Sequence, residues 1–341
     1  MNPGRRISLP FAGVVCVVLA TTFLTLPPAA PAADRSEADA VVRAGASGQW
    51  LARESTGLAR GEVAMARVGR FAYLGWGGTL LERYNFRRDV WVPLGDLPAV
   101  LNHIQAVVLD RRIYWIGGLV MQPGRPKPAS DSVWVYDPAS GSIDSGAPMP
   151  EGRERGAGGV AVHDGLIYYV GGLIAEPISG ENIAVPWVDV YDPIADEWTS
   201  LPDMPRARDH FQAVVVDDML WAIGGRTGMA QTPFGYVDAL DLSTGDWTSG
   251  YAELPTPRGG YAVALLGDEI LVIGGEGNGK AYRKVEAYDP VGNTWRTLAP
   301  MRSRRHGFQA VVRGGRVYVA DGGMRQGGGL ATDTTEVFVP D

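Results

Sequence analysis

The sequence predicts an all-β protein folded as a six-bladed propeller. Six glycine pairs each follow a short apolar run, and the first glycines of the pairs lie 40, 54, 53, 50 and 48 residues apart. A repeat of about 50 residues built from short strands is typical of propeller blades with four strands each. The pairs are Gly77-Gly78, Gly117-Gly118, Gly171-Gly172, Gly224-Gly225, Gly274-Gly275 and Gly322-Gly323.

A second spacing supports the same period. A tyrosine, or a residue in its place, precedes a tryptophan by seven residues in four repeats, and Tyr136 precedes Ile143 by the same distance. Asp-Pro pairs such as Asp192-Pro193 lie between the two positions and favour a turn, because proline fixes one dihedral angle and aspartate bonds the backbone two residues on. The four pairs are Tyr84 and Trp91, Tyr191 and Trp198, Leu240 and Trp247, and Tyr288 and Trp295.

The glycine pairs, the Tyr-to-Trp spacing and a Met/Leu-Pro-x-x-Arg segment together resemble the kelch repeat. The resemblance covers the chain from about Trp50 to the C-terminus. It implies a propeller, but kelch propellers include oxidases, sugar isomerases and pure binding modules, so it specifies the fold more closely than the function.

The two ends of the propeller predict how the ring closes. The last repeat stops with Phe338 at the tyrosine position and has no tryptophan strand of its own. The segment around Trp50 precedes every glycine pair and matches the missing strand. We therefore expect an N-terminal strand to complete the last blade, which removes an open sheet edge.

Residues 1–32 have the features of a signal peptide. Arg5 and Arg6 begin the segment, residues 11–26 are apolar, and Ala30-Pro31-Ala32 offers a cleavage site. We expect residues 33–46 to be a linker and residues 47–341 to form the propeller. The mature protein would be secreted or periplasmic, a monomer, and without a membrane span after cleavage; an uncleaved anchor, and general or twin-arginine export, stay open.

Composition excludes several kinds of chemistry. Cys16 is the sole cysteine and lies in the signal segment, so the copper radical oxidases resembling galactose oxidase, which need a cysteine cross-linked to a tyrosine, are excluded. The four histidines lie in different repeats without metal-ligand spacing, so we predict no metal and no cofactor. These are His103, His163, His210 and His306.

Charge argues against a nucleic-acid partner. The formal net charge is −7, and loss of the two arginines in residues 1–32 makes it −9. No run of basic residues would offset this acidity toward a phosphate backbone.

Strand direction places the variable loops after the glycines and the Pro-x-x-Arg loops on one face, opposite the Asp-Pro turns. Long loops such as residues 119–132 and 173–187 on a rigid scaffold favour binding there. The ligand-binding candidates on this face are Arg60, Arg155 (with Arg153 as the other alignment), Arg208, Arg226, Arg258 and Arg305.

Two interpretations of these arginines stay open. A ring of guanidinium groups recognises carboxylates or phosphates, and the resemblance to kelch adaptors implies a grip on acidic peptide segments. The partner would then be a glycan, an acidic peptide or a protein. Alternatively, each arginine pairs with a recurring strand acid; these acids are Glu82, Asp189, Asp238, Glu286 and Glu336.

Two function classes follow. The first is an exported, non-catalytic binding or scaffold module. The second is a cofactor-free sugar isomerase or mutarotase, because Glu276 after a glycine pair and Arg283 seven residues on are similar to the arrangement in bacterial sialic-acid epimerases; Glu276 would transfer the proton and Arg283 would hold a sugar carboxylate. Binding is favoured because no nucleophile with its base, metal cluster or phosphate loop is present. Three glutamines in alternate repeats either line the channel or record a duplication; they are Gln105, Gln212 and Gln309.

Overall fold

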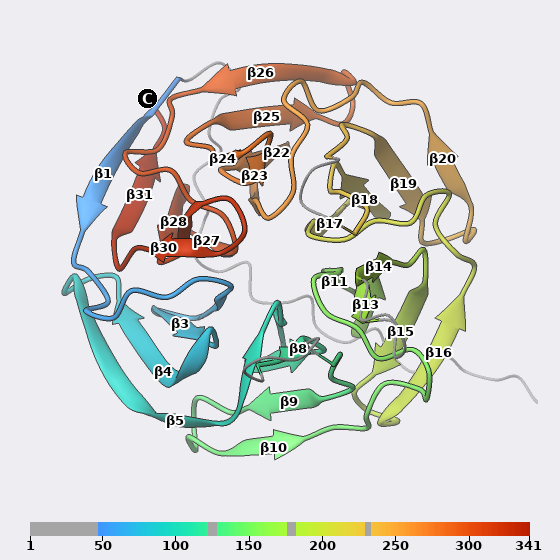
Figure 1. The fold of residues 1–341 in the computed structure, drawn as a ribbon, viewed down its shortest axis with the longest axis horizontal. Coiled ribbons are helices and arrows are strands. Elements are labelled where there is room, and N and C mark those ends of the chain that lie inside the picture. Colours follow the sequence, from blue (N-terminus) through green and yellow to red (C-terminus); the bar gives the residue numbers. More distant parts are fainter. Residues whose placement is uncertain (1–46, 122–127, 176–181, 229–232) are drawn as a thin grey trace, which may run out of the picture. The chain divides into compact units, whose positions relative to one another are not determined.

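The computed structural model describes residues 47–121, 128–175, 182–228 and 233–341, which belong to one compact unit, Asp39–Asp341. Six antiparallel sheets, five with four strands and one with five, stand around a central axis as the blades of a closed propeller (Figure 1). The predicted signal peptide and linker lie outside the described residues. Within the described ranges, no helix is long and apolar enough to cross a membrane.

Each blade runs from an inner strand at the axis to an outer strand at the rim. Blade 1 holds β2 (Ala64–Val68), β3 (Phe71–Gly75), β4 (Gly78–Asn85) and β5 (Val90–Asn102); blade 2 holds β6 (Gln105–Leu109), β7 (Arg112–Ile116), β9 (Val133–Tyr136) and β10 (Ile143–Ser145); blade 3 holds β11 (Gly159–His163), β12 (Leu166–Val170), β15 (Val188–Asp192) and β16 (Glu197–Leu201).

Blade 4 holds β17 (Ala213–Val216), β18 (Met219–Ile223), β19 (Val237–Asp241) and β20 (Trp247–Ser249); blade 5 holds β21 (Ala262–Leu266), β22 (Glu269–Ile273), β25 (Val285–Asp289) and β26 (Thr294–Leu298); blade 6 holds β27 (Ala310–Arg313), β28 (Arg316–Ala320), β31 (Thr335–Val339) and β1 (Gln49–Arg53). Shorter strands extend from this framework. They are β8 (Leu119–Val120) beside β5 and the hairpins β13–β14 (Leu173–Ala175, Asn182–Ala184), β23–β24 (Glu276–Gly277, Lys280–Ala281) and β29–β30 (Gly323–Arg325, Gly329–Ala331).

The predicted closure of the ring is confirmed. The N-terminal strand β1 pairs antiparallel with β31, so it forms the outer strand of blade 6 (Figure 1). Trp50 lies directly opposite Phe338 in this pairing, and their rings are 5.4 Å apart. The last blade therefore has its tryptophan strand, which covers the edge that β31 would otherwise expose.

The seven-residue Tyr-to-Trp spacing marks positions that face each other across the two outer strands of a blade. Tyr84 lies opposite Trp91, and Tyr136 lies opposite Ile143 where the tryptophan is replaced. The tryptophans also join blades, since the indole N–H of Trp198 in blade 3 donates to the carbonyl of Ala147 after blade 2 at 2.9 Å. Trp50, Trp91 and Trp295 donate to the preceding blade in the same way.

The hydrophobic core is divided into layers between neighbouring blades. Val285 of blade 5, Phe338 of blade 6 and Tyr84 of blade 1 are all buried in one such cluster. Burial on both faces explains why strands such as β22 are nearly continuous in apolar residues, which is the pattern expected of a strand covered on both sides.

The glycine pairs form joints between blades. Gly117 has a φ of 69°, and a Cβ there would lie 2.3 Å from the carbonyl oxygen of Arg155 in the next blade. The amide of the next glycine, Gly118, donates to that carbonyl at 3.1 Å. In blades 1 and 6 the equivalent joints are Trp76-Gly77 and Asp321-Gly322, one residue earlier than the predicted glycine pairs. Trp76 and Asp321 adopt the left-handed conformation at the first position, with φ of 70° and 56°.

Candidate functional site

The variable loops after the glycine pairs and the Pro-x-x-Arg segments lie side by side on one face, here called the loop face. Isolated bridges join Asp209 to Arg226, and others join Gly259 to Glu276 and His306 to Gly323. The hairpins β13–β14, β23–β24 and β29–β30 belong to the same loops. The arrangement is the one that strand direction predicts.

The arginines of the Pro-x-x-Arg position are buried within the blades. Arg155, Arg208, Arg258 and Arg305 are 0% exposed, and Arg60 is 4% exposed. Each forms an ion pair with the strand acid of its own blade, as the second interpretation of the sequence had it. The pairs are Arg60–Glu82, Arg155–Asp189, Arg208–Asp238, Arg258–Glu286 and Arg305–Glu336.

Arg258 illustrates how fully these side chains are bonded. Its Nε donates to the carbonyl of Gly274 at 2.6 Å, its Nη2 to that of Val272 at 2.9 Å, and its Nη1 to Glu286 at 2.5 Å. Its own carbonyl accepts the amide of Gly225 in blade 4. Burial lowers the pKa of Arg258, and the charge of Glu286 opposes this effect. The side chain holds its blade together, and the backbone joins it to the preceding blade.

A second arginine reaches the surface in blades 3 and 4. Arg153 donates to Asp189 at 2.8 Å and Arg206 donates to Asp238, but their side chains are 22% and 36% exposed. Each guanidinium lies over an aromatic ring, Arg153 over Trp187 at 4.8 Å and Arg206 over Tyr236 at 4.4 Å. We call Arg153, Trp187, Arg206 and Tyr236 the arginine–aromatic sector.

Sequence reasoning weighed Arg153 only as an alternative alignment and did not single out Arg206. The signal was available, because both arginines stand two residues before the buried arginine. In both blades, an aromatic residue also stands two residues before the strand acid. The exposed arginine lies near this aromatic residue because the strand acid forms ion pairs with both the exposed and the buried arginine.

A ring of backbone surrounds the axis on the loop face. A residue just before each inner strand has a φ between 54° and 65°, in the left-handed region. Amide donors pass from blade to blade around this ring; for example, His210 donates to Ala157 at 2.7 Å and Ala157 donates to His103 at 2.8 Å. The six ring residues are Glu62, His103, Ala157, His210, Gly260 and Gly307.

Charged side chains gather inside this ring. Glu62 lies 3.4 Å from Nε2 of His103 and 3.4 Å from Nε2 of His306, and His306 lies 3.2 Å from Glu276. Glu276 also accepts from Arg226. Asp209 completes the group by pairing with Arg226 and with Nδ1 of His210. We call these seven residues the axial cluster; they are Glu62, His103, Asp209, His210, Arg226, Glu276 and His306.

The electrostatics of the cluster are coupled. Burial alone would raise the pKa of Glu62, but His103 and His306 outweigh it and hold that pKa well below 4.5. Burial alone would lower the pKa of His306, but Glu62 and Glu276 outweigh it and raise that pKa above 6.5. The two groups therefore stabilise each other's charged forms.

The structure thus brings two of the predicted site residues together and separates a third from them. Arg226 and Glu276 are 7% and 2% exposed and pair with each other. Arg283 is an exposed residue whose Nε donates to the carbonyl of Met301. Glu276 and Arg283, the pair that the isomerase alternative requires, have different partners.

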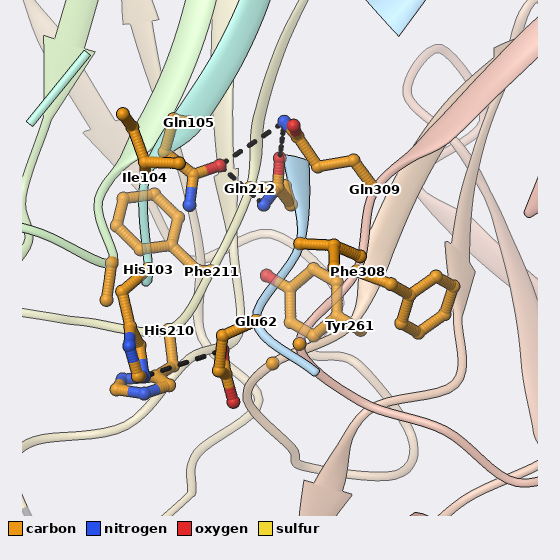
Figure 2. Close-up of a pocket in the computed structure, with 14 residues that line it drawn as sticks. Glu62, His103, Ile104, Gln105, His210, Phe211, Gln212, Tyr261, Phe308 and Gln309 are labelled. Carbon is orange, nitrogen blue, oxygen red and sulfur yellow. Dashed lines mark hydrogen bonds and ion pairs between the residues drawn. The ribbon is translucent and has the colours of Figure 1, made fainter. Parts of the chain in front are cut away.

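A small cavity lies on the axis between the axial cluster and the three glutamines (Figure 2). Its volume is about 30 Å³, which is room for about one water molecule. Gln212 donates to Gln105 at 2.8 Å, and Gln309 donates to Gln212 at 3.2 Å and to Gln105 at 3.3 Å. The three glutamines therefore line the axial cavity and hydrogen-bond to one another.

No group of three or more His, Cys, Asp and Glu side chains in the described ranges is arranged to hold a metal ion. The chemistry of the loop face is that of ion pairs, hydrogen bonds and aromatic surfaces.

Comparisons with known proteins agree with the repeat architecture. Three family profiles match the chain: the KLHDC2/KLHL20/DRC7 Kelch-repeats domain at residues 188–328, and the Kelch motif at residues 154–205 and 101–150.

Curated relatives share the repeat but are longer. Kelch-like protein terF of Aspergillus terreus is 34% identical over 297 residues, which cover 82% of this chain and 64% of terF. Kelch-like protein 38 of Rattus norvegicus is 30% identical over 240 residues, 70% of this chain and 39% of that protein. The chain therefore spans less than two thirds of the length of these relatives.

A solved structure shares the fold. The structure of YjhT superposes with a TM-score of 0.71 and covers 83% of this chain and 95% of its own, at 16% sequence identity. At this identity the likeness concerns the fold alone.

Proposed function

Because the chain is a kelch-repeat β-propeller, we propose that it is a non-catalytic binding or scaffold module that recognises an anionic glycan, peptide or protein partner on its loop face. Its kelch-like relatives favour a protein-interaction module. The anionic character of the partner is inferred from the cations that reach this face.

The observation that carries the proposal is the stack of Arg206 on Tyr236. The guanidinium lies 4.4 Å from the ring centroid, and Tyr236 is 41% exposed. An arginine fixed on an aromatic ring loses little entropy when it meets a carboxylate, and the ring adds apolar surface for a sugar or a side chain. Arg153 on Trp187 repeats the arrangement in the neighbouring blade.

The buried arginines support this site indirectly. Arg208 neutralises one oxygen of Asp238 and leaves the other to Arg206. Arg155 and Arg153 also share Asp189, but there Arg153 donates to both oxygens of the carboxylate. The proposal keeps the predicted ligand site on the loop face. It assigns the contacts with the ligand to the partly exposed arginines, Arg153 and Arg206.

An array of acidic glycans and Asp/Glu-rich peptides, with neutral counterparts, tests the proposal. We expect the protein to bind acidic members and Arg206→Ala to weaken that binding by about 1 to 1.5 kcal/mol, a modest value because the group is partly exposed. The matched control is Ile194→Ala, which changes a residue 92% exposed beside an Asp-Pro turn. Equal binding of neutral and acidic members, or full binding by Arg206→Ala, would contradict the proposal.

Non-catalytic action has its own test. Carboxylated sugars from the same array, incubated with the protein and followed by NMR, should stay unchanged. Turnover that Glu276→Ala abolishes would contradict this part of the proposal and would favour a sugar isomerase.

We further propose that the protein is exported, with cleavage after Ala32. The support is the basic start, apolar core and small-residue site of residues 1–32. N-terminal sequencing of secreted or periplasmic material should begin at Ala33. Recovery of Met1 in a membrane fraction would identify an anchor instead.

A further inference from the structure

The ring around the axis carries ionisable side chains where glycine would fit. Blades 5 and 6 have Gly260 and Gly307 at the left-handed position and blade 3 has Ala157, whereas Glu62, His103 and His210 adopt the same conformation with an ionisable side chain. A side chain in this region costs conformational free energy. Strain of this kind clusters at functional sites, and the side chains of Glu62, His103 and His210 all belong to the axial cluster.

The contacts of His306 determine its protonation. Its Nδ1 lies 2.9 Å from the carbonyl oxygen of Gly323, which can only accept, so Nδ1 carries a hydrogen. Its Nε2 faces Glu276 at 3.2 Å and Glu62 at 3.4 Å. A neutral ring would direct a lone pair at two carboxylates. These contacts favour the imidazolium form of His306.

The two carboxylates around His306 hold loops from different blades. Glu276 begins the hairpin of blade 5, accepts from Arg226 of blade 4 and accepts the amide of Gly327, in the hairpin of blade 6, at 2.7 Å. Glu62 contacts His103 of blade 2. His306 thus stands between two carboxylates that bind the loops together.

We propose that the axial cluster is a pH-operated clamp, in which a proton on His306 holds the hairpins β23–β24 and β29–β30 against each other and its loss as the pH rises releases them. Without that proton, the carboxylates Glu62, Glu276 and Asp209 face one permanent cation, Arg226. The remaining ionisable neighbours in the cluster are His103 and His210.

The direction of the pH dependence follows from the same contacts. The pKa of His306 is raised above 6.5 by Glu62 and Glu276 against the effect of burial. The clamp is therefore closed in mildly acidic solution and opens as the pH rises through that higher pKa. The proposed clamp does not depend on the proposed binding function. If the protein has both, its affinity for a partner should change over the same pH range.

Amide exchange in residues 323–331 tests the clamp in the wild-type protein. After correction for the intrinsic rate, protection should fall between pH 6 and pH 8.5, by roughly tenfold for each unit by which the pKa of His306 is raised. NMR titration of the imidazole should place that pKa above 6.5. Equal protection at the two pH values, or a pKa at or below 6.5, would overturn the clamp.

Variants assign the effect to His306. His306→Gln should remove the pH dependence of exchange in residues 323–331. His163→Gln is the control, because His163 also lies near a carboxylate, 3.4 Å from Asp218, but on the opposite face. A pH dependence that survives in His306→Gln would overturn the assignment, and if this variant fails to fold, the wild-type titration decides.

Discussion

Arg206 and Arg208 bind the two oxygens of one carboxylate, that of Asp238, yet only Arg206 reaches the surface. Arg208 is completely buried, whereas the side chain of Arg206 is 36% exposed. The guanidinium group of Arg208 therefore holds the blade together, whereas that of Arg206, two residues earlier, is presented to solvent. Position relative to the strand acid, and not residue type, decides the role.

Substitution of these two arginines should separate the roles. Arg208→Ala leaves Asp238 buried without its main counter-ion and should lower the free energy of unfolding by about 3 to 5 kcal/mol. Arg206→Ala removes a partly exposed ion pair and should cost at most about 1 kcal/mol. Urea unfolding measures both losses. Similar losses for the two variants would contradict the division between them.

Stability should fall as the pH rises above neutrality. The folded-state pKa of His306 is raised, so its contribution is complete below about pH 6.5 and is lost as the pH rises through the folded value. Asp321 acts in the same direction at lower pH, because burial, opposed by Arg60, raises its pKa to about 7. Urea unfolding from pH 6 to 8.5 should show the decline, with a smaller slope in His306→Gln.

The opposite sign applies to Glu62. Its folded-state pKa is depressed, so its contribution is present above about pH 4.5 and is lost as the pH falls through the lower folded value. Glu62→Gln should therefore flatten the acid limb of the stability profile. An unchanged acid limb in this variant would show that Glu62 is not charged in the folded protein.

Ring closure should depend on Trp50. This side chain is 6% exposed, packs on Phe338 and donates to the carbonyl of Ala299 in blade 5. Trp50→Ala should cost about 3 to 5 kcal/mol, measured by urea unfolding, with Ile194→Ala as an exposed control. Deletion of residues 1–55 should further cause aggregation; a deletion that melts like the full chain would contradict closure through this strand.

The three glutamines on the axis should differ in importance. The side-chain oxygen of Gln309 accepts the backbone amides of Met65 and Ala106, at 3.2 and 3.1 Å. Gln309→Leu would leave both amides unpaired, at about 1 to 3 kcal/mol each. Gln212→Leu breaks side-chain bonds only and should cost less. Thermal unfolding of the two variants compares them directly.

Much of the fold was predictable because its determinants are local in sequence. The glycine pairs, the Asp-Pro turns and the seven-residue spacing each act within one blade. Each of these patterns therefore predicts a strand or a turn without knowledge of the other blades. Closure was predictable for a related reason, since Phe338 lacked a tryptophan and Trp50 lacked a tyrosine. The shift to Asp321-Gly322 was not predictable, because only the φ angles reveal which residue takes the left-handed position.

The candidate site was less predictable because its contacts join distant segments. The sequence allowed Arg258 either to bind a ligand or to pair with Glu286. It did not reveal how deeply that pair is buried. Glu62 and His306 lie in the first and last blades, so their contact exists only in the closed ring. No spacing in the sequence reports that contact.

Pairing of β1 with β31 also sets the order of assembly. Gln49, the first residue of β1, lies opposite Val339, the last residue of β31. Synthesis makes β1 before any other strand, and β1 can pair only when the final strand is complete. Such distant pairing is slow to form. Until then the growing chain exposes an unmatched strand, so chaperone protection or delayed folding should matter more for this protein than for one closed within a single blade.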